Sequence, residues 1–569
     1  MLQRVARAHL SHVSTLSKAP YMAPTFGELR SLMNTRTLDE DQRALLWAMV
    51  ARAARDHRDA YTSQWTPYMR GFPRHFEDAV HGVHSVEALE HAHALLPWAK
   101  FNLNLEKDST SADVDALVGS RALGALHTLT LSGSYLDQHV LGHLLKHLEG
   151  TRLTALHAVH SYLEDTLIRT LSERALPATL TTLGLGYNNM GISGAALFAD
   201  TPVLEGLRAL DLTRNQLDAS SAHILASASH LRGLQRLNLH GNAMQQEGAR
   251  ALLCSGALES LKALRLSSNG VRAPSWKPWP ASHPAPPLEE LDMSDNWMGD
   301  EGAQMLSGWR GMGDLRVLNL AGNSLGDDGL RAVLSVAPRA NNRTLILQRN
   351  DLTAAGVGAL ARWAHTEGLG HLDLTGNPLA DAGVQALAGA SNLGALHTLD
   401  LGYVRAHDQG CQALAATHMP ALGALNLSGN RLSAKGLHAL AHAPWARTLH
   451  TLDLSYSKLR DEDLHTLTHA PNLGGLVNLD LSGNDLGDEA VVRLAASPVF
   501  SSLRSLNLGG NCIKDLGARA LAASDNLPSL LRLSLEYNLV QQEGALALRA
   551  RSVERSWVAL ELKGNRVPP

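Results

Sequence analysis

Residues 315–341 read LRVLNLAGNSLGDDGLRAVLSVAPRAN, and this stretch contains the pattern that decides the fold. It begins with three closely spaced leucines, continues through Asn323, Gly326 and Gly329, and ends in an apolar pattern with helical spacing. Side chains of a strand alternate between its two faces, so Leu318 and Leu320 are expected on the buried face of a short strand. The stretch therefore predicts a strand, a turn and a helix.

The same pattern recurs along the chain at an almost constant interval. Its first position falls at residues 126, 153, 180, 207, 234, 261, 288, 315, 342, 369, 396, 422, 449, 476, 503, 530 and 557. Each step is 27 residues, except for the step of 26 from 396 to 422. A fixed period of this length is typical of a solenoid, whose repeats bury their apolar faces against one another and cannot fold alone. Because a helix is wider than a strand, the stack is expected to bend.

Three further positions of the repeat have structural explanations. Asn323 closes the strand, where its amide can both donate to and accept from the turning backbone. Asp327 precedes the helical pattern and is expected to cap the positive end of that helix. Gly329 is expected to let one helix approach the next closely. Asparagine and glycine return at these positions in most repeats and aspartate returns in several, so the three positions indicate a fold and not a ligand site.

The repeat resembles the ribonuclease-inhibitor-like class of leucine-rich repeats, whose pattern is LxxLxLxxNxLxxxGxxxLxxxL. The resemblance covers residues 98–569, as about 18 repeats of 27 residues. It implies an α/β solenoid, a leucine-rich repeat horseshoe with parallel β-strands on the concave face and helices on the convex face. Most members of the class bind other proteins on the concave face. The fold by itself does not select one function.

Residues 1–97 lack the period and read mainly as helices, notably at 39–58 and 86–96. The stretch from Trp65 to Leu103 is similar to the end of a companion module that precedes bacterial repeat arrays. An open sheet needs its first strand covered, so residues 1–97 are expected to form a mainly helical N-terminal cap. The alternative is an active module that the array only targets.

One repeat lacks the helical pattern. Between Val271 and Leu288 the chain reads RAPSWKPWPASHPAPP, and this density of proline favours extended structure over a helix. Trp279 falls where other repeats place a core leucine, and it is expected to plug the gap. A contact strip on the convex face that includes Trp276 is the alternative.

Composition and motifs exclude several classes of function. A net charge of −4 with 18% charged residues gives no support to a nucleic-acid partner. The first twenty residues contain no apolar run that could serve as a signal peptide or membrane span, and no such run is expected elsewhere. Three scattered cysteines suggest free thiols in a reducing compartment, so a cytoplasmic protein without a membrane partner is expected.

Catalytic signatures are also missing. No lysine is followed by serine or threonine, so the phosphate-binding loop that ends in GKS or GKT is absent. Neither CxxC nor HExxH occurs. Glu87 and His91 lie one helical turn apart in a histidine-rich stretch, but a chain with 28 histidines is expected to crowd some of them. The sequence therefore predicts no enzyme, no cofactor and no metal.

The candidate binding residues are those that point away from the core on neighbouring strands. Equivalent positions form ladders, since parallel strands lie about 4.8 Å apart. In one ladder Asp373 stands beside Asp400, and Asp453 stands beside Asp480. Like charges placed opposite each other destabilise a sheet, so another role is expected. Tyrosines and histidines lie near these aspartates, and tyrosines are typical anchors of protein interfaces. The candidate partner-binding residues are therefore His371, Asp373, His397, Asp400, Tyr403, His450, Asp453, Tyr456 and Asp480.

These observations predict a non-catalytic scaffold or inhibitor that binds a protein partner, with basic character, on the concave surface from about residue 371 to 483. The alternative is that this surface has no partner. In that case its aspartates only keep the sheet hydrated, and its tyrosines pack on neighbouring residues. A mixed-charge strip from Arg208 to Asp295 is a second location. The alternative functions are a GTPase-activating regulator of a small GTPase and a targeting array for an active N-terminal module.

Overall fold

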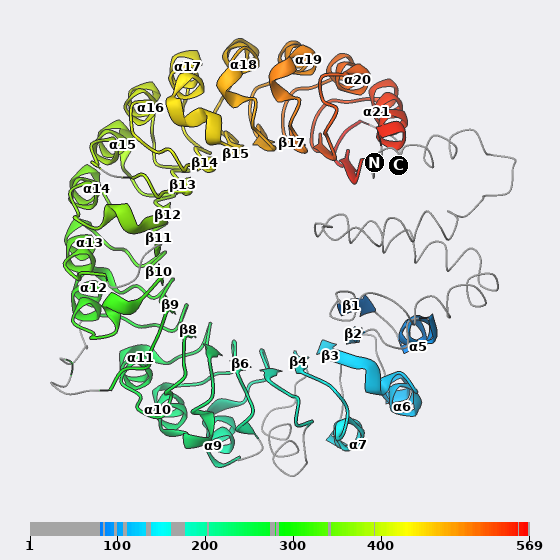
Figure 1. Ribbon diagram of the computed structural model, residues 1–569, viewed down its shortest axis with the longest axis vertical. Helices are drawn as coiled ribbons and strands as arrows, with labels where there is room; N and C mark the ends of the chain where they lie inside the picture. Colours follow the sequence, from blue (N-terminus) through cyan, green and yellow to red (C-terminus); the bar gives the residue numbers. More distant parts are fainter. Residues whose placement is uncertain are drawn as a thin grey trace, which may run out of the picture. The chain divides into compact units, whose positions relative to one another are not determined.

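The computed structural model describes residues 80–83, 86–95, 100–105, 111–132, 138–160, 177–201, 204–273, 279, 284–338, 343–391, 393–555 and 557–566. The chain forms two compact units. The first comprises Met1–Gly270 and Ser282–Pro287, and the second comprises Val271–Ala281 and Leu288–Pro569. In both units the described strands are parallel to their neighbours, and helices lie between most of the successive described strands (Figure 1).

In the first unit each strand pairs in parallel with the next along the chain. The strands are β1 (Val80–Val83), β2 (Lys100–Leu105), β3 (Leu126–Ser132), β4 (Ala155–Val159), β5 (Thr182–Gly184), β6 (Ala209–Asp211), β7 (Arg236–Asn238) and β8 (Ala263–Arg265). The α-helices are α5 (Val86–Leu95), α6 (Ser111–Gly119), α7 (Gln138–Leu148), α9 (Gly191–Asp200), α10 (Ala219–Ser227) and α11 (Gln245–Leu253). Short 3-10 helices are η2 (Leu123–Ala125) and η4 (Ser229–Leu231).

The second unit continues the same alternation, again with consecutive parallel pairing. Its strands are β9 (Glu290–Asp292), β10 (Val317–Asn319), β11 (Arg343–Ile346), β12 (Leu369–Asp373), β13 (Thr398–Asp400), β14 (Ala424–Asn426), β15 (Thr451–Asp453), β16 (Asn478–Asp480), β17 (Ser505–Asn507), β18 (Arg532–Ser534) and β19 (Ala559–Glu561).

Helices cover one side of these strands in the second unit (Figure 1). They are α12 (Gly299–Ser307), α13 (Asp327–Leu334), α14 (Ala354–Ala361), α15 (Ala380–Ala388), α16 (Asp408–Ala415), α17 (Ala434–His442), α18 (Asp461–Thr468), α19 (Asp488–Ala496), α20 (Asp515–Ala523) and α21 (Gln542–Arg555). The 3-10 helices are η5 (Met312–Asp314), η6 (Thr366–Gly368), η7 (Pro444–Thr448), η8 (Pro471–Leu473) and η9 (Pro498–Phe500). The predicted α/β leucine-rich repeat solenoid, in which parallel strands alternate with helices along the chain, is confirmed.

The core is built from the leucines that define the repeat. Leu315, Leu318 and Leu320 are all buried, and the equivalent leucines of the neighbouring strands are buried as well. Burying each leucine stabilises the fold by roughly 1.5–3 kcal/mol, which explains why the spacing is so constant.

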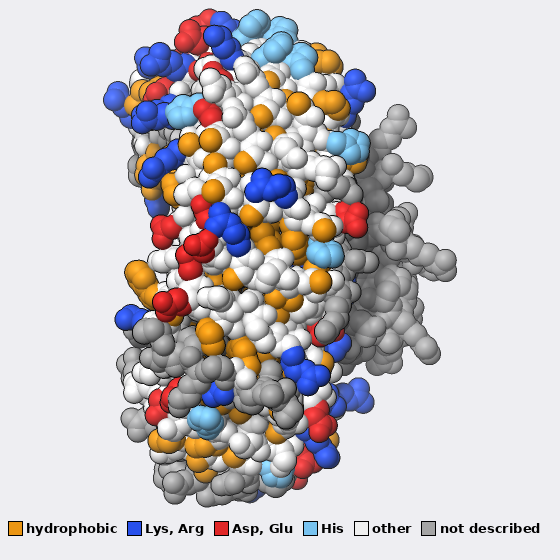
Figure 2. Space-filling view, turned by 90° about the vertical axis from the view of Figure 1, so that its left-hand side faces the viewer, with side chains coloured by type: hydrophobic (Ala, Val, Ile, Leu, Met, Phe, Trp, Pro, Cys, Tyr) orange, Lys and Arg blue, Asp and Glu red, His pale blue; other side chains and the backbone are white. Residues whose placement is uncertain are grey.

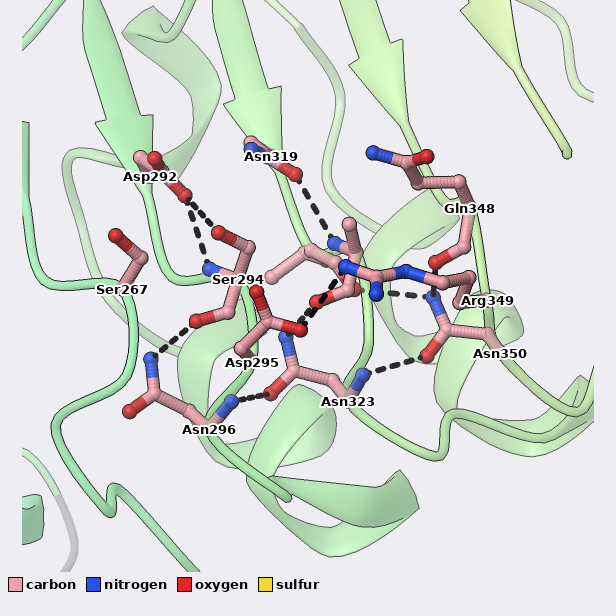
Figure 3. A network of polar contacts seen from close by, with 12 residues as sticks. Ser267, Asp292, Ser294, Asp295, Asn296, Asn319, Asn323, Gln348, Arg349 and Asn350 are labelled. Atoms are coloured by element: carbon pink, nitrogen blue, oxygen red, sulfur yellow. Dashed lines mark hydrogen bonds and ion pairs between the residues drawn. The ribbon is translucent and has the colours of Figure 1, made fainter. Parts of the chain in front are cut away.

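The asparagines after the strands form the predicted ladder. The backbone N–H of Asn296 donates to Oδ1 of Asn323 (3.1 Å), and the N–H of Asn323 donates to Oδ1 of Asn350 (3.0 Å), as Figure 3 shows. The amide Nδ2 of Asn323 donates back to the carbonyl of Met293 in the previous repeat (2.9 Å). Each buried amide thus satisfies backbone groups on both sides, which confirms its structural role.

The prediction for Asp327 is wrong in one respect. Asp327 is the first residue of α13, whose N-cap is Gly326, and its side chain does not cap that helix. It accepts hydrogen bonds instead from the backbone N–H (2.9 Å) and the hydroxyl (2.6 Å) of Thr353, at the start of α14 in the next repeat. The Asp327 carboxylate bonds to the next repeat because stacking places the backbone N–H and hydroxyl of Thr353 within hydrogen-bonding distance of it.

The recurring glycine is explained by the same contact. A Cβ built on Gly356 would lie 2.3 Å from Oδ1 and 3.2 Å from Cα of Asp327. Gly517 has the same relation to Asp488, which accepts its backbone N–H at 2.8 Å. The expectation of close approach between successive repeats is therefore confirmed, and the approaching group is the aspartate that precedes it by one repeat.

The described sheet begins before the first regular repeat. Residues 86–96 were expected to be helical, and α5 confirms this from Val86 to Leu95. Strand β1 was not expected, yet it pairs in register with β2, Val80 facing Lys100. Residues 1–79, including the expected helix at 39–58, lie outside the described residues. The N-terminal cap stays a prediction.

At the proline-rich repeat, the described residues between β8 and β9 contain no helix. Trp279 is only partly buried. Its indole N–H donates to the carbonyl of Met305 near the end of α12 (2.6 Å), and its ring lies against Gly308. Trp279 therefore covers the end of the next helix, and Trp276 of the alternative strip lies outside the described residues.

Candidate partner-binding surface

Strands β12 to β16 place the predicted aspartates in one ladder. Asp373 faces Asp400, and Asp453 faces Asp480, with Asn426 of β14 between the two pairs. All five side chains are partly exposed. We refer to Asp373, Asp400, Asn426, Asp453 and Asp480 together as the acidic surface.

A local turn explains why this position is polar. Oδ1 of Asp453 accepts the backbone N–H of Ser455 at 2.9 Å. Asp480 accepts both the N–H (2.8 Å) and the hydroxyl (2.6 Å) of Ser482. Asp373 makes the equivalent bond to the N–H two residues later, at 2.9 Å. Each bond fixes the end of its strand and satisfies a donor that would otherwise need water.

The same turn does not explain the negative charge. Asn426 accepts the N–H of Ser428 at 2.9 Å, the same bond that Asp373, Asp453 and Asp480 make. Figure 3 shows this equivalence on two adjacent strands, where Asp292 bonds to Ser294 and Asn319 bonds to the backbone N–H of Ala321. A neutral amide thus performs the turn function without charge repulsion. The carboxylates of the acidic surface need another explanation.

The charge is also unfavourable where it stands. Burial raises the pKa of Asp453 above its usual value, and the carboxylates of Asp480 and Asp400 raise it further against the hydrogen bonds from Ser455. Burial likewise raises the pKa of Asp373, with Asp400 acting in the same direction. The ionised surface is therefore destabilised by its own neighbours, and a cation placed on it would relieve that cost.

One predicted histidine is bonded to the acidic surface. Nε2 of His371 lies 2.9 Å from Oδ2 of Asp400, and this hydrogen bond raises the pKa of His371. His397 and His450 are exposed and belong to a different ladder, one position earlier in their repeats. Gly423 lies between them in that ladder, with the backbone N–H of His450 donating to its carbonyl (2.8 Å). The structure thus joins only His371 to the aspartates.

The two tyrosines have an arrangement that the sequence did not reveal. Tyr403 and Tyr456 occupy left-handed backbone conformations, each with φ of 55°, and remain 51% and 59% exposed. A Cβ built on Gly429 would lie 2.3 Å from Cδ1 of Tyr403, and one on Gly483 would lie 2.5 Å from Cδ1 of Tyr456. Each ring therefore lies over the glycine of the next repeat.

This packing combines both readings of the tyrosines. The part of each ring that covers a glycine packs on the array, as the alternative without a partner predicts. About half of each side chain stays exposed. A signal for it exists in the sequence, since the repeat that follows each of these tyrosines has glycine at the equivalent position. A fixed, half-exposed aromatic ring loses little conformational entropy on binding, which suits an interface anchor.

The asparagine ladder is altered beside both tyrosines. Ser457 replaces the amide in one repeat, where its N–H donates to Asn484 Oδ1 (3.0 Å) and its hydroxyl donates to the Leu427 carbonyl (3.3 Å). Val404 replaces it in the other and supplies no side-chain acceptor. There the N–H of Leu379 turns to the carbonyl of Asn377 instead (2.9 Å).

The Arg208–Asp295 strip has local partners in each compact unit. In the first, Nη1 of Arg208 donates to the carbonyl of Gly233 at 2.9 Å. In the second, Asp295 pairs with Arg349 two repeats later (3.2 Å), across Gly322 (Figure 3). These contacts give the strip structural explanations, and its role in binding stays a prediction.

Two further properties bear on ligands. Within the described parts of the chain, no three or more His, Cys, Asp or Glu side chains are grouped so that they could hold a metal ion. His84, from the histidine-rich stretch near the N-terminus, lies outside those parts. None of the helices in the described residues is both long and apolar enough to cross a membrane.

The match to one protein-family model agrees with the repeat architecture. A leucine-rich repeat family model matches residues 285–307, 314–334, 369–388, 419–441, 476–495 and 501–522. A chain of the TLR13–ssRNA13 complex is 20% identical, with a TM-score of 0.40, and the match covers 85% of this chain and 63% of that one. A chain of the mouse RP105/MD-1 complex is 18% identical, with a TM-score of 0.41, covering 86% and 91%.

This chain thus spans less than two thirds of the TLR13 chain. The search of curated proteins found no match. The six matched segments fall on the strand, turn and helix units described above. The chain therefore contains leucine-rich repeats, and these build its α/β solenoid.

Proposed function

We propose that this protein is a non-catalytic interaction scaffold or inhibitor, and that strands β12 to β16 bind a protein partner with basic side chains. The observation that carries the proposal is the use of aspartate where Asn426 makes the same turn bond without charge. Natural selection for stability alone favours the neutral residue, because like charges on adjacent strands repel.

A basic partner would change the energetics of this surface. Placing an arginine or lysine beside Asp453 and Asp480 relieves the repulsion that raises the pKa of Asp453. Charge complementarity of this kind also steers association and rejects acidic competitors. Tyr403 and Tyr456 add aromatic area next to the charges. The repeat length and the helices that follow most of the described strands further support assignment to the ribonuclease-inhibitor-like class.

The reducing cytoplasm is the compartment that we propose. Cys254, Cys411 and Cys512 are all free, and burial raises the pKa of the Cys411 thiol to about 12, which keeps it protonated and unreactive. The proposed partner is therefore a cytoplasmic protein.

The test compares capture from native cell extract by the wild type and by a variant with Asp373→Asn, Asp453→Asn and Asp480→Asn. Asparagine keeps the turn acceptor, so the variant is expected to remain folded by circular dichroism. We expect a basic protein to be lost from the variant, with at least a tenfold weaker affinity when it is measured directly. The matched control is Asp292→Asn, which makes the same turn bond to Ser294 outside the acidic surface.

A second variant, Tyr403→Ala with Tyr456→Ala, tests the anchors separately. Loss of the same protein from both variants would place its binding site on this surface. Equal capture by the wild type and the asparagine variant would refute the proposal and move the search to the Arg208–Asp295 strip or to residues 1–97.

A further inference from the structure

Two neighbouring helices of the second unit carry pairs of histidines that the proposed function does not use. His438 and His442 lie on α17, and His465 lies on α18 with His469 at its C-cap. Within each pair the residues are four apart and therefore share one face of the helix. The pairs are separated by 27 residues, so they occupy equivalent positions of adjacent repeats.

The two rings of each pair lie against each other on the surface. Their centroids are 4.1 Å apart on α17 and 4.3 Å apart on α18. All four side chains are exposed. Histidine side chains gather at the top of the space-filling view, the end at which Figure 1 places α17 and α18 (Figure 2). An ion in solvent can therefore approach both pairs.

Hydrogen bonding leaves a ring nitrogen available in each pair. Nδ1 of His442 lies 2.8 Å from the carbonyl oxygen of His438, and Nδ1 of His469 lies 2.9 Å from that of His465. A carbonyl can only accept, so Nδ1 carries the proton of the neutral ring and Nε2 keeps its lone pair. A hydrogen bond from the other ring nitrogen to a backbone carbonyl is the contact that orients metal-binding histidines in proteins.

We propose that each pair chelates a transition-metal dication that favours imidazole, such as Ni²⁺, Cu²⁺ or Zn²⁺. Two histidines spaced by four on a helix supply two ligands on one side of the ion, the spacing found in helical zinc motifs. Water, or a donor from a second molecule, fills the other positions. This arrangement agrees with the finding that no described group offers three ligands.

A third pair in the first unit has the same construction. On α7, the rings of His143 and His147 have centroids 4.7 Å apart, and Nδ1 of His147 lies 2.9 Å from the carbonyl of His143. The proposal therefore assigns three binding sites of one kind to the described residues, two of them on adjacent repeats.

The test is titration of the full chain, purified without a tag, with Ni²⁺ by calorimetry. In a variant with His442→Ala and His469→Ala, each chelate becomes a single ligand. We expect two equivalents of Ni²⁺ to lose at least tenfold in affinity, while the remaining sites are unchanged. The matched control is His223→Ala with His418→Ala, which removes two exposed histidines that belong to none of the pairs and is expected to leave the titration unaltered.

Circular dichroism of both variants confirms that the array remains folded. A second readout is the Cu²⁺ electron paramagnetic resonance spectrum, which reports how many imidazole nitrogens bind each ion. Two nitrogens per ion are expected at every pair in the wild type, whereas the double variant should show one nitrogen at each of the two altered sites and two at the α7 site. An unchanged titration in the double variant, or wild-type binding weaker than about 1 mM, would overturn the proposal and show adventitious binding only.

Discussion

Replacing Gly429 by alanine tests the contact that fixes Tyr403. Gly429 has φ of +65°, and its missing Cβ leaves the space in which the Tyr403 ring lies. Alanine imposes two separate costs. The backbone must hold an L-residue in the left-handed region, and the tyrosine ring must lift away from the next repeat.

The structure allows both costs to be sized. An L-residue in the left-handed conformation costs roughly 1–2 kcal/mol. Tyr403 is 51% exposed, so about half of its surface is covered. For a tyrosine this is about 100 Å², worth about 2.5 kcal/mol at ~25 cal/mol per Å². If the part over Gly429 is about half of that, lifting the ring costs about 1 kcal/mol, and Gly429→Ala should cost about 2–3 kcal/mol in total.

Gly510→Ala is the matched control. Gly510 also has φ of +65°, but a Cβ there would meet only the backbone of Gly483, at an ordinary 3.5 Å. It should cost about 1–2 kcal/mol, the backbone term alone. The difference between the two variants isolates the tyrosine contact.

The assay is native-state hydrogen exchange read by mass spectrometry, because it reports the opening free energy of individual repeats in an array. Peptides covering residues 422–456 report on Gly429→Ala, and peptides covering 503–530 report on Gly510→Ala. In a Tyr403→Ala background the extra cost at Gly429 should vanish. Equal costs at the two glycines, or an extra cost that survives in the Tyr403→Ala background, would refute the reasoning.

Three further results are expected. Asp327→Ala should destabilise the array by about 1–3 kcal/mol in urea unfolding, because the start of the next helix loses its acceptor, whereas the exposed neighbour Asp328→Ala should stay within about 0.5 kcal/mol. Iodoacetamide at pH 8 should label the exposed Cys512 readily and the buried Cys411 only after unfolding, as peptide mapping would show. In the wild type, ionisation of Asp373 should lower the free energy of unfolding as pH rises above 3.8, and Asp373→Asn should remove this contribution.

The sign of the last prediction follows from the direction of the pKa shift. Burial raises the pKa of Asp373 in the folded state, so between 3.8 and that higher pKa the folded chain binds more protons than the unfolded chain. Stability therefore falls as pH rises through this window, and the neutral asparagine removes that contribution. An identical pH profile for Asp373→Asn would contradict it, as equal losses for Asp327→Ala and Asp328→Ala would contradict the contact between repeats. Early labelling of Cys411 would show that its repeat opens.

The period of 27 residues was sufficient to predict the strand, the turn and the helix of each repeat. Those assignments depend on local spacing, since Leu318 and Leu320 share a strand face whatever lies beyond them. The role of Asn323 was also predictable, because an amide can donate to and accept from the backbone of stacked turns. The acidic ladder followed as well, since a constant period places Asp453 and Asp480 on adjacent strands.

Contacts between repeats decided the rest. Asp327 reaches the start of the next helix, and Tyr403 reaches the next glycine, because stacking brings a side chain nearer to the following repeat than to other groups in its own. The sequence gives residue types and their spacing along the chain, but the direction of a side chain depends on which neighbour offers a free N–H or an open space. Local periodicity therefore determined the repeat of this protein, and tertiary packing determined which of its polar and aromatic groups remain available to a partner.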